Sequence, residues 1–377
     1  MEYKICDLMN INRGASPRPI IEYLTDSGYR WLKISDFSPG DRYVYKTKEY
    51  IKEEGITKTK FLKKGTLILT NSATPGIPIF LGEDMCLHDG FLYFQNIKEE
   101  IISKEYLYYW FIFNRNNIVN QANGSVFKNL KKEIVMNLSI SLPSLNTQKK
   151  VVKILDSITR KIETNNQTND NLYELGDALY KEYYSKYENE LPNGYKYLNL
   201  NEVSVNFDSK RKPMSSRERE QHKGIYPYYG ATSIIDYVDD YIFDDTYLLM
   251  GEDGTVKTNE GYPVLQYIWG KSCINNHTHV LQGTIISTEH LMFALRKKNI
   301  ETLITGAVQP KINQENMNKI KIIIATDDIN IKFEEQIKII VDKIKFNSIE
   351  NITLTQLRNT LLPKLMNGKI DLNKIEV

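Results

Sequence analysis

The residues best suited to chemistry in this chain are basic and polar side chains that gather in two separate regions. Lysine and arginine bind phosphate oxygens, and amide and hydroxyl groups hydrogen-bond to base edges, so such clusters can contact nucleic acid. The candidates in the first region are Arg13, Arg18, Lys58, Lys60, Lys63, Lys64, Asn71, Ser72 and Lys128. The candidates in the second region are Lys210, Arg211, Lys212, Arg217, Arg219, Lys223, Tyr229, Thr255, Lys257 and Lys271.

The segment from Lys210 to Lys223 is the strongest of these candidates. A single basic residue is more commonly a solvated surface charge. Residues 208–223, however, carry six lysines and arginines against three acidic residues. Because the excess is concentrated in one short segment, this loop as a unit favours contact with DNA.

No motif in the chain indicates catalysis or a bound metal. Gly270-Lys271-Ser272 resembles the end of a phosphate-binding loop, but that motif needs glycine at the position of Leu265. Cys273, His277 and His279 lack a fourth ligand at a standard spacing, so a strand with alternating histidines is the better interpretation. Neither an Asn/Asp-Pro-Pro-Tyr/Phe methyltransferase motif nor a Gly-x-Ser-x-Gly elbow occurs. We therefore expect no catalytic residue, metal or cofactor in this chain.

Length and composition limit the class of protein. The 377 residues suffice for two or three domains, and a net charge of +2 means that any basic surface must be local. The three cysteines are far apart, which is typical of reduced thiols in the cytoplasm. No run of about 18 apolar residues indicates a membrane span, and the first residues lack the layout of a signal peptide. We expect a cytoplasmic protein without a membrane partner.

An internal repeat organises the elements that must position these residues. Residues 151–179 repeat at 333–361 with a constant offset of 182 and no gap. The repeated positions follow alternating four- and three-residue steps that skip only Gly176 and Arg358, the heptad spacing of a helix with a narrow apolar seam. In the first copy they are Val151, Leu155, Ile158, Ile162, Asn165, Asn169, Leu172 and Leu179. In the second they are Phe333, Ile337, Ile340, Ile344, Asn347, Asn351, Leu354 and Leu361.

The seam predicts that the two long helices pair with each other. Because the chain is duplicated, a pseudo-two-fold axis is expected, and this axis makes the pair an intramolecular antiparallel coiled coil. Asn165, Asn169, Asn347 and Asn351 then cluster near the axis. Buried asparagines lower stability but penalise slipped registers, so we expect these four to fix the helix register and the spacing of the domains. The alternative is a solvated, weakly packed middle of the helix.

The segments between the helices have mixed periodicity and predict α+β domains. Short apolar runs favour strands at Thr66–Thr70, Phe91–Phe94, Tyr247–Met250 and Ile320–Ile324. Serine or threonine opens predicted helices at Ser103–Phe113 and Thr288–Arg296. The expected domains are a first globular domain at 1–143, a central helix at 144–190, a second globular domain at 191–328 and a C-terminal helix at 329–377.

Several segments of the chain resemble the specificity subunits of type I restriction-modification systems. The closing segment Leu357-Arg358-Asn359-Thr360-Leu361-Leu362-Pro363-Lys364-Leu365-Met366-Asn367-Gly368 looks like their C-terminal signature. Leu142-Pro143-Ser144 with Gln148, Leu191-Pro192-Asn193-Gly194-Tyr195, Tyr228-Tyr229-Gly230-Ala231 and Gly251-Glu252-Asp253-Gly254 resemble other recurrent pieces. The second half departs from the pattern at Ala325-Thr326 and Asn330, which blurs one boundary.

The resemblance implies two target-recognition domains, each of which reads one half of a split DNA site. It also implies that the helices set the unread spacer and bind two methyltransferase subunits, which use S-adenosylmethionine. Two restriction subunits that use ATP and Mg²⁺ join in some systems. The chain itself is then a non-catalytic DNA-binding subunit. Three alternatives remain: the specificity subunit of a combined type II methyltransferase-nuclease, a coiled-coil scaffold that joins two protein-binding domains, and a self-sufficient DNA-modifying enzyme.

Overall fold

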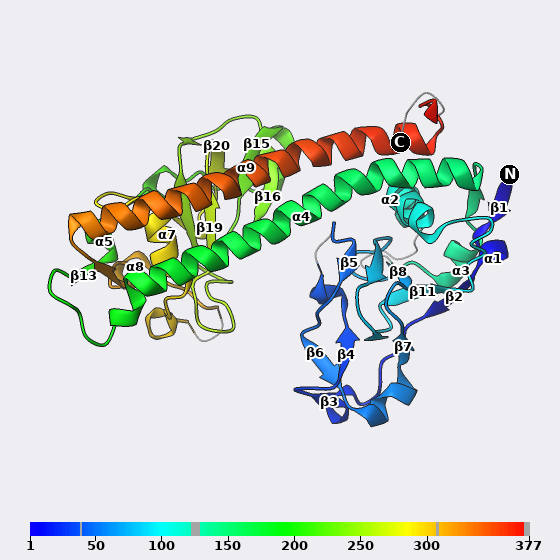
Figure 1. The fold of residues 1–377 in the computed structure, drawn as a ribbon, viewed down its shortest axis with the longest axis horizontal. Helices are drawn as coiled ribbons and strands as arrows, with labels where there is room; N and C mark the ends of the chain where they lie inside the picture. The colour runs from blue at the N-terminus through cyan, green and yellow to red at the C-terminus, as the bar shows by residue number, and fades with distance from the viewer. Residues whose placement is uncertain (38–39, 122–128, 307–308, 373–377) are drawn as a thin grey trace. The chain divides into compact units, whose positions relative to one another are not determined.

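The computed structural model describes residues 1–37, 40–121, 129–306 and 309–372 (Figure 1). The chain divides into two compact units, residues 1–162 with 351–377 and residues 163–350. Each unit contains one globular α+β domain and half of each long helix. The predicted fold class, two α+β domains and two long paired helices, is confirmed.

The two globular domains begin and end with the same order of elements, as the sequence repeat predicts. The first contains β1 (Glu2–Lys4), α1 (Ile5–Leu8), β2 (Asn10–Arg13), β3 (Leu24–Thr25), β4 (Tyr29–Leu32), β5 (Tyr43–Val44), β6 (Glu49–Ile51), β7 (Lys60–Leu62), β8 (Leu67–Thr70), β9 (Pro78–Leu81), β10 (Met85–Leu87), β11 (Phe91–Gln95), α2 (Lys104–Asn120), α3 (Lys132–Met136) and β12 (Ser139–Ser141). The second contains β13 (Lys196–Asn199), α5 (Leu200–Val203), β14 (Ser204–Asn206), α6 (Ser216–Gln221), β15 (Lys223–Tyr229), β16 (Ile234–Val238), β17 (Phe243–Asp244), β18 (Tyr247–Gly251), β19 (Leu265–Ile268), β20 (Lys271–Ile274), β21 (Thr278–Gly283), α7 (Thr288–Arg296), α8 (Gln314–Asn318) and β22 (Lys321–Ile324).

The sheets show the same duplication. In each domain the first and last strands form a two-stranded antiparallel sheet, β1-β12 in one and β13-β22 in the other. The larger sheets have the orders β2-β11-β8-β9-β5 and β3-β6-β4-β10-β7 in the first domain. In the second domain the orders are β14-β21-β18-β19 and β16-β15-β20-β17. The first domain pairs β4 with β10 in parallel, and the second domain pairs β15 with β20 in parallel. This feature of the topology therefore repeats although the loops differ.

The long helices are α4 (Leu145–Tyr183) and α9 (Asp327–Met366), and they run antiparallel. In the second unit, Asn169 on α4 meets Asn347 on α9, whereas Tyr184, just after α4, meets Asn330 near the start of α9. In the first unit, the Lys150 Nζ donates to the Leu372 carbonyl beyond the end of α9. Later residues of α4 therefore contact earlier residues of α9, as an antiparallel pair requires.

The apolar seam of each helix is buried as the heptad spacing predicts. Val151 and Leu155 share one core with Leu362 and Leu365 of α9 in the first unit. In the second unit, buried residues of α9 share a core with α4 and with α7; they are Phe333, Ile337, Ile340 and Ile344. An apolar side chain of this size contributes roughly 1.5–3 kcal/mol when fully buried, so packing rather than propensity stabilises the helices.

The helix ends follow their local sequence. The Ser103 hydroxyl accepts from the Tyr106 amide at the start of α2, and Ser287 accepts from the His290 amide at the start of α7, so both predicted caps are confirmed. At the C-terminal end of α9, Gly368 has a φ of 65°, the left-handed conformation that glycine adopts without strain. Pro363 does not end α9, which continues to Met366.

Candidate nucleic-acid interface

The lysine cluster predicted in the first domain lies around β7, but two of its members already have partners. Lys63 forms an ion pair with Asp84 at 2.8 Å. Lys58 hydrogen-bonds to the Tyr23 hydroxyl, and its Nζ lies 4.6 Å from the centre of that ring. Lys60 and Lys64 are exposed. The cluster therefore offers fewer free cations than the sequence indicates.

A cleft in the first domain brings Arg13 and Asn71 together with two lysines that the sequence analysis missed. Its lining residues are Arg13, Asn71, Asn129, Leu130, Lys131, Lys132 and Glu133. Arg13 ends β2, Asn71 follows β8, and the lysines lie at the start of α3, so three segments distant in sequence converge here. Ser72, beside Asn71, is half-buried. Within the described part of the chain, the Asn71 Oδ1 is buried without a hydrogen-bond partner.

Arg18 is exposed at the edge of a second cleft, which Trp31 and His88 also line. Burial and the nearby cations Lys33, Arg13 and Arg18 lower the pKa of His88, although Asp89 opposes them. His88 is therefore neutral near pH 7. Lys128 lies outside the described residues.

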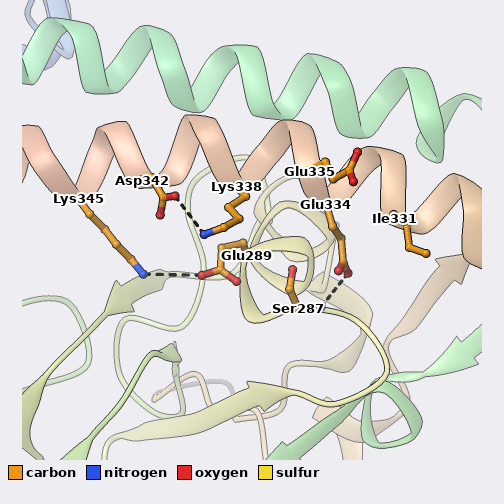
Figure 2. A pocket seen from close by; sticks show the side chains of 8 residues that line it. All are labelled: Ser287, Glu289, Ile331, Glu334, Glu335, Lys338, Asp342 and Lys345. Carbon is orange, nitrogen blue, oxygen red and sulfur yellow. Dashed lines mark hydrogen bonds and ion pairs between the residues drawn. The ribbon is translucent and has the colours of Figure 1, made fainter.

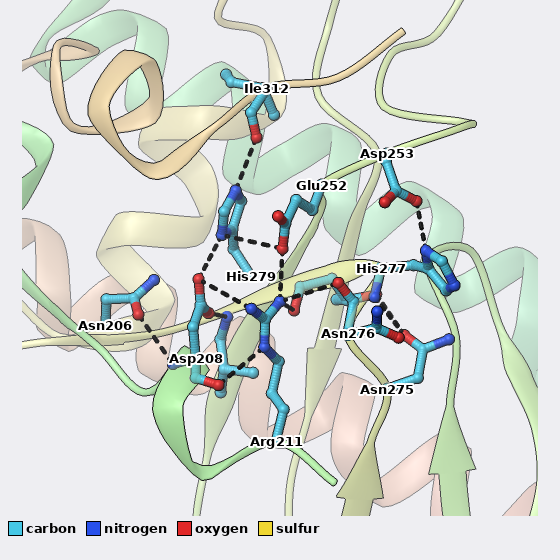
Figure 3. A network of polar contacts seen from close by, with 12 residues as sticks. Asn206, Asp208, Arg211, Glu252, Asp253, Asn275, Asn276, His277, His279 and Ile312 are labelled. Carbon is cyan, nitrogen blue, oxygen red and sulfur yellow. Dashed lines mark hydrogen bonds and ion pairs between the residues drawn. The ribbon is translucent and has the colours of Figure 1, made fainter. Parts of the chain in front are cut away.

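In the second domain, Arg211 is held inside a network of polar contacts rather than presented to solvent (Figure 3). Its Nη1 lies 2.6 Å from the Glu252 carboxylate and 2.8 Å from the Thr278 carbonyl, and its Nε donates to the Asp208 carbonyl at 2.9 Å. Only 14% of its side chain is exposed. Arg211 therefore joins the loop before α6 to the turn before β21.

His279 of β21 completes this network through both of its ring nitrogens. Its Nδ1 lies 2.6 Å from the Asp208 carboxylate and its Nε2 lies 2.9 Å from the Ile312 carbonyl, which can only accept. Burial raises the pKa of Asp208, but the hydrogen bond and charge of His279 outweigh it, so the pKa is lowered and the carboxylate is ionised. Lys311 lies 3.2 Å from Glu252, so the two carboxylates face both Arg211 and Lys311 as well as the ring of His279.

The same network holds three groups that could ligate a metal ion. Asp208, Glu252 and His279 offer ligand atoms within 4.8 Å of one another. Arg211, however, contacts both carboxylates and would compete with a metal ion for their oxygens. The expectation of alternating histidines on one strand is wrong in part: His279 lies on β21, but His277 precedes that strand and contacts Asp253. Burial also raises the pKa of the Cys273 thiol, which disfavours the thiolate that binds metals.

The other basic residues of the Lys210–Lys223 segment divide into two groups. Lys210, Lys212 and Arg217 are exposed. Arg219 and Lys223, in contrast, both form ion pairs with Asp236 on the neighbouring strand β16, at 3.2 and 2.5 Å. The exposed group is free to bind phosphate, whereas the paired group first has to leave Asp236.

The remaining candidates of the second domain lie in different settings. Tyr229 lies on β15 and packs in part against a buried apolar cluster. Burial raises the pKa of Tyr229. Lys271 lies 4.4 Å from the ring centre of Tyr241, and the hydrogen bond that its ammonium donates to the Tyr241 oxygen raises the pKa of Lys271. Lys257 pairs with Glu301, and Thr255 is exposed.

The central asparagines of the helices form specific contacts. The Asn347 Nδ2 donates to the Asn169 Oδ1 at 2.8 Å, and both residues are buried. The Asn165 Nδ2 donates to the Glu350 carboxylate at 2.7 Å. Asn351 is half-buried and belongs to the first unit. Their role in fixing the register stays a prediction.

Buried ion pairs between each domain and α4 were not foreseen from the sequence. In the first unit, Arg42 contacts Asp156 of α4 through two hydrogen bonds of 2.6 and 3.2 Å. In the second unit, Arg296 of α7 contacts Asp177 of α4 in the same manner, at 2.8 and 3.2 Å. Such fork-to-fork pairs fix orientation as well as distance. No periodic pattern connects these residues, since each arginine lies more than one hundred positions from its partner.

These features define a class of protein with two α+β domains, each joined by an arginine–aspartate pair to a long helix of a helix pair. A family model described as the type I restriction modification DNA specificity domain matches residues 1–174 and 192–359. The chain belongs to this family. The predicted resemblance is thereby confirmed, and so is the function that it implies, DNA recognition in a restriction-modification system.

Individual relatives agree with this membership. The chain is 22% identical to the type I restriction enzyme MjaIX specificity subunit of Methanocaldococcus jannaschii, over 99% of this chain and 94% of the relative. It is also 22% identical to the HindI specificity subunit of Haemophilus influenzae, over 72% and 78% of the two chains. A crystal structure of the specificity subunit from M. genitalium superposes with a TM-score of 0.54 at 16% identity and covers 97% of this chain and 95% of its own. This last likeness concerns the fold.

Among the helices of the described residues, none is long and apolar enough to cross a membrane.

Proposed function

We propose that this chain is the non-catalytic DNA-reading subunit of a type I complex and that each globular domain reads one half of a bipartite target. The observation that carries the proposal is the double match of the specificity-domain model, once to each half of the chain. The two reading domains comprise residues 1–143 and 191–328. The intervening helix and the C-terminal helix at 329–377 separate the two half-sites.

The exposed cations of the two domains are the proposed phosphate contacts. In the first domain these are Lys60 and Lys64 with the cleft around Arg13, and in the second domain they are Lys210, Lys212 and Arg217. Each cation that neutralises a phosphate releases counterions, so binding weakens as salt rises. Arg211 is assigned a structural role, because its donors are already used within the domain.

The outer face of α9 is the proposed contact with a methyltransferase subunit. On the part of this helix that belongs to the second unit, four apolar residues at helical spacing are more than half exposed; they are Ile331, Ile339, Phe346 and Ile349. They lie opposite the buried seam, so the helix is apolar on two sides, which is typical of a helix that has a further partner. Two such subunits, one for each half-site, would supply S-adenosylmethionine-dependent methylation. Restriction subunits that use ATP and Mg²⁺ would complete a cleaving complex.

A cleft beside this face supports a protein partner rather than DNA (Figure 2). It lies between α7 and α9 and is lined by Ser287, Glu289, Ile331, Glu334, Glu335, Lys338, Asp342 and Lys345. Four of these side chains are acidic and two are basic, and the lysines pair with Asp342 and Glu289. The net negative charge disfavours a phosphate backbone.

Whole-genome methylation mapping with and without this gene tests the proposal. We expect one split, adenine-methylated motif to disappear when the gene is removed. The purified chain alone should methylate nothing, whereas the chain with its methyltransferase subunits should methylate the motif. An unchanged methylome in a strain with an active methyltransferase subunit contradicts the proposal. DNA binding that does not respond to salt would instead favour a protein scaffold.

Paired variants test the partner face. Ile339→Lys should weaken capture of the methyltransferase subunit while leaving the melting temperature unchanged. Gln336→Lys introduces the same charge at an exposed position away from the apolar face and serves as the control. Equal capture by the two variants contradicts the assignment of this face.

A further inference from the structure

The turn between β10 and β11 fixes one edge of the Arg13 guanidinium. The Arg13 Nε donates to the Asp89 carbonyl oxygen at 2.7 Å, and its Nη2 lies 3.6 Å from the Asp89 carboxylate. The side chain is nevertheless 58% exposed, so the other guanidinium donors are not consumed by this contact. An arginine that is held on one side and open on the other is oriented in advance for a second acceptor.

Asp89 is itself immobilised by two further side chains. The Ser16 hydroxyl donates to the Asp89 Oδ1 at 2.9 Å, and the His88 Nε2 lies 3.1 Å from the same oxygen. The Gly90 amide donates to the His88 Nδ1 at 2.9 Å, which leaves the ring proton on Nε2. His88 therefore donates to Asp89 as a neutral ring. Because Oδ1 receives both donors, Oδ2 remains for Arg13.

The backbone beside Arg13 also depends on a close approach to this turn. A Cβ at Gly14 would lie 2.1 Å from the His88 carbonyl oxygen, which is closer than any side chain tolerates. The Gly14 amide donates to the Phe91 carbonyl at 2.9 Å, and the Ala15 amide donates to the Leu87 carbonyl at 3.0 Å. The chain that carries Arg13 is thus fastened to both strands that flank Asp89.

The surroundings of Arg13 favour an anionic or acceptor-rich ligand. Lys131 and Lys132 line the same cleft, and Glu133 is its only acidic lining residue among those described. The second domain provides a contrast, because Arg211 contacts two carboxylates and three backbone carbonyls and is only 14% exposed. The donors of Arg211 are used within the domain, whereas Arg13 keeps exposed donors beside Lys131 and Lys132.

Resting on the proposed function, we propose that Asp89 is a positioning residue that holds Arg13 to contact acceptor atoms of the first half-site. The acceptors are phosphate oxygens or the O6 and N7 atoms of a guanine, which present the same chemistry to a guanidinium. Asp89 touches no DNA in this proposal. It acts through Arg13 alone.

A double-mutant cycle on the full chain, assembled with its methyltransferase subunits, tests this role. The probe is a duplex that contains the methylated motif identified by genome mapping. Arg13→Ala should weaken binding by roughly 5- to 150-fold, the range of a good arginine contact. Asp89→Asn should weaken it about two- to fivefold, the coupling of a partly exposed ion pair. This loss should vanish in the Arg13→Ala background.

The direction of the Asp89→Asn effect decides between positioning and simple charge. Removing a carboxylate near DNA strengthens binding if the carboxylate only repels phosphate. Tighter binding by Asp89→Asn, or an equal loss in the Arg13→Ala background, therefore overturns the proposal. Asparagine keeps the Oδ1 acceptor for Ser16 and His88, so the fold should remain, and the melting temperature checks this. Lys98→Ala removes an exposed cation outside the cleft and is the matched control.

Two readouts separate the possible acceptors from each other and from failure of the proposed function. If Arg13→Ala relaxes one base of the first half-site in the methylation map, the acceptor is guanine. If it lowers affinity for all sequences and reduces the salt dependence by about one contact, the acceptor is phosphate. Either result supports the proposal. If Arg13→Ala produces neither change, the proposal is overturned. If the wild-type complex has no motif at all, the proposed function has failed instead.

Discussion

Asn347 of α9 donates a hydrogen bond of 2.8 Å to Asn169 of α4, and both amides are buried in the helix pair. The Asn169 Nδ2 also lies 3.3 Å from the Ser348 hydroxyl. Asn169 and Asn347 both occupy core positions of otherwise apolar heptads, so the two amides meet only when the helices are in this register. A slip by one heptad would place each amide against isoleucine or leucine, where it would be buried without a partner.

Single replacements of this amide pair should be more damaging than the double replacement. Asn169→Leu or Asn347→Leu leaves the other buried amide without the hydrogen bond between them, which costs about 1–3 kcal/mol in the free energy of unfolding. The double variant removes both amides and should recover most of that loss. Urea unfolding measures all three, with Gln167→Leu at an exposed position of α4 as the control. Singles that match Gln167→Leu would show that the pair does not contribute.

The same double variant tests the role of these asparagines in register. If the amides fix the register, the double variant, assembled with its partners, should methylate motifs with more than one spacer length. Methylation mapping of a strain that carries the variant measures the spacer directly. A single unchanged spacer length contradicts the predicted role.

The Arg42–Asp156 pair should be the most sensitive attachment of the first domain. Arg42 is 2% exposed, and the Tyr109 hydroxyl donates to the same carboxylate at 2.8 Å. Arg42→Ala removes the buried cation and leaves Asp156 to the exposed Arg160 at 3.8 Å, so we expect a loss of about 3–5 kcal/mol in unfolding free energy. Lys338→Ala breaks the exposed pair with Asp342 and should cost no more than about 1 kcal/mol. Equal losses for the two variants would contradict a buried role for Arg42.

Sequence periodicity predicted the parts of this fold that repeat, and it missed the parts that depend on tertiary contact. The heptad steps located α4 and α9, and short apolar runs located β8, β11, β18 and β22. The pairing of Arg42 with Asp156, and of Arg13 with Asp89, has no local signal, because each joins distant segments. The basic loop at Lys210 was identified from composition, but composition does not distinguish an exposed lysine from Arg211, whose charge is neutralised within the fold.

The stability of the second unit should fall in mild acid because of His290. Burial lowers the pKa of His290, and only Glu334 opposes this by a hydrogen bond. The folded state therefore binds the proton less readily than the unfolded state does. The stabilisation is complete above the unfolded pKa, near 6.5, and is lost as the pH falls below it.

Replacing His290 with phenylalanine isolates this contribution. The ring is packed among Tyr184 and Phe333, at centroid distances of 4.9 and 4.7 Å, so an aromatic replacement preserves the packing. Urea unfolding between about pH 7.5 and 5.5 should show a smaller slope for His290→Phe than for the wild type. This range lies above the lowered pKa of Glu334, so that carboxyl stays ionised throughout. Identical slopes would assign the acid sensitivity to another group.

Neighbouring basic residues of the second domain should separate stability from DNA binding. Arg211→Ala removes the cation that contacts Asp208 and Glu252, so two partly buried carboxylates lose a partner. We expect a loss of about 2–4 kcal/mol in unfolding free energy, by the penalty for unpaired buried charge.

Lys212→Ala and Arg217→Ala alter exposed side chains and should change stability by less than about 0.5 kcal/mol. The same two variants should reduce the salt dependence of DNA binding by about one contact each. If Arg211→Ala instead keeps the wild-type melting temperature and loses DNA affinity, the guanidinium contacts DNA and the network of Figure 3 opens on binding.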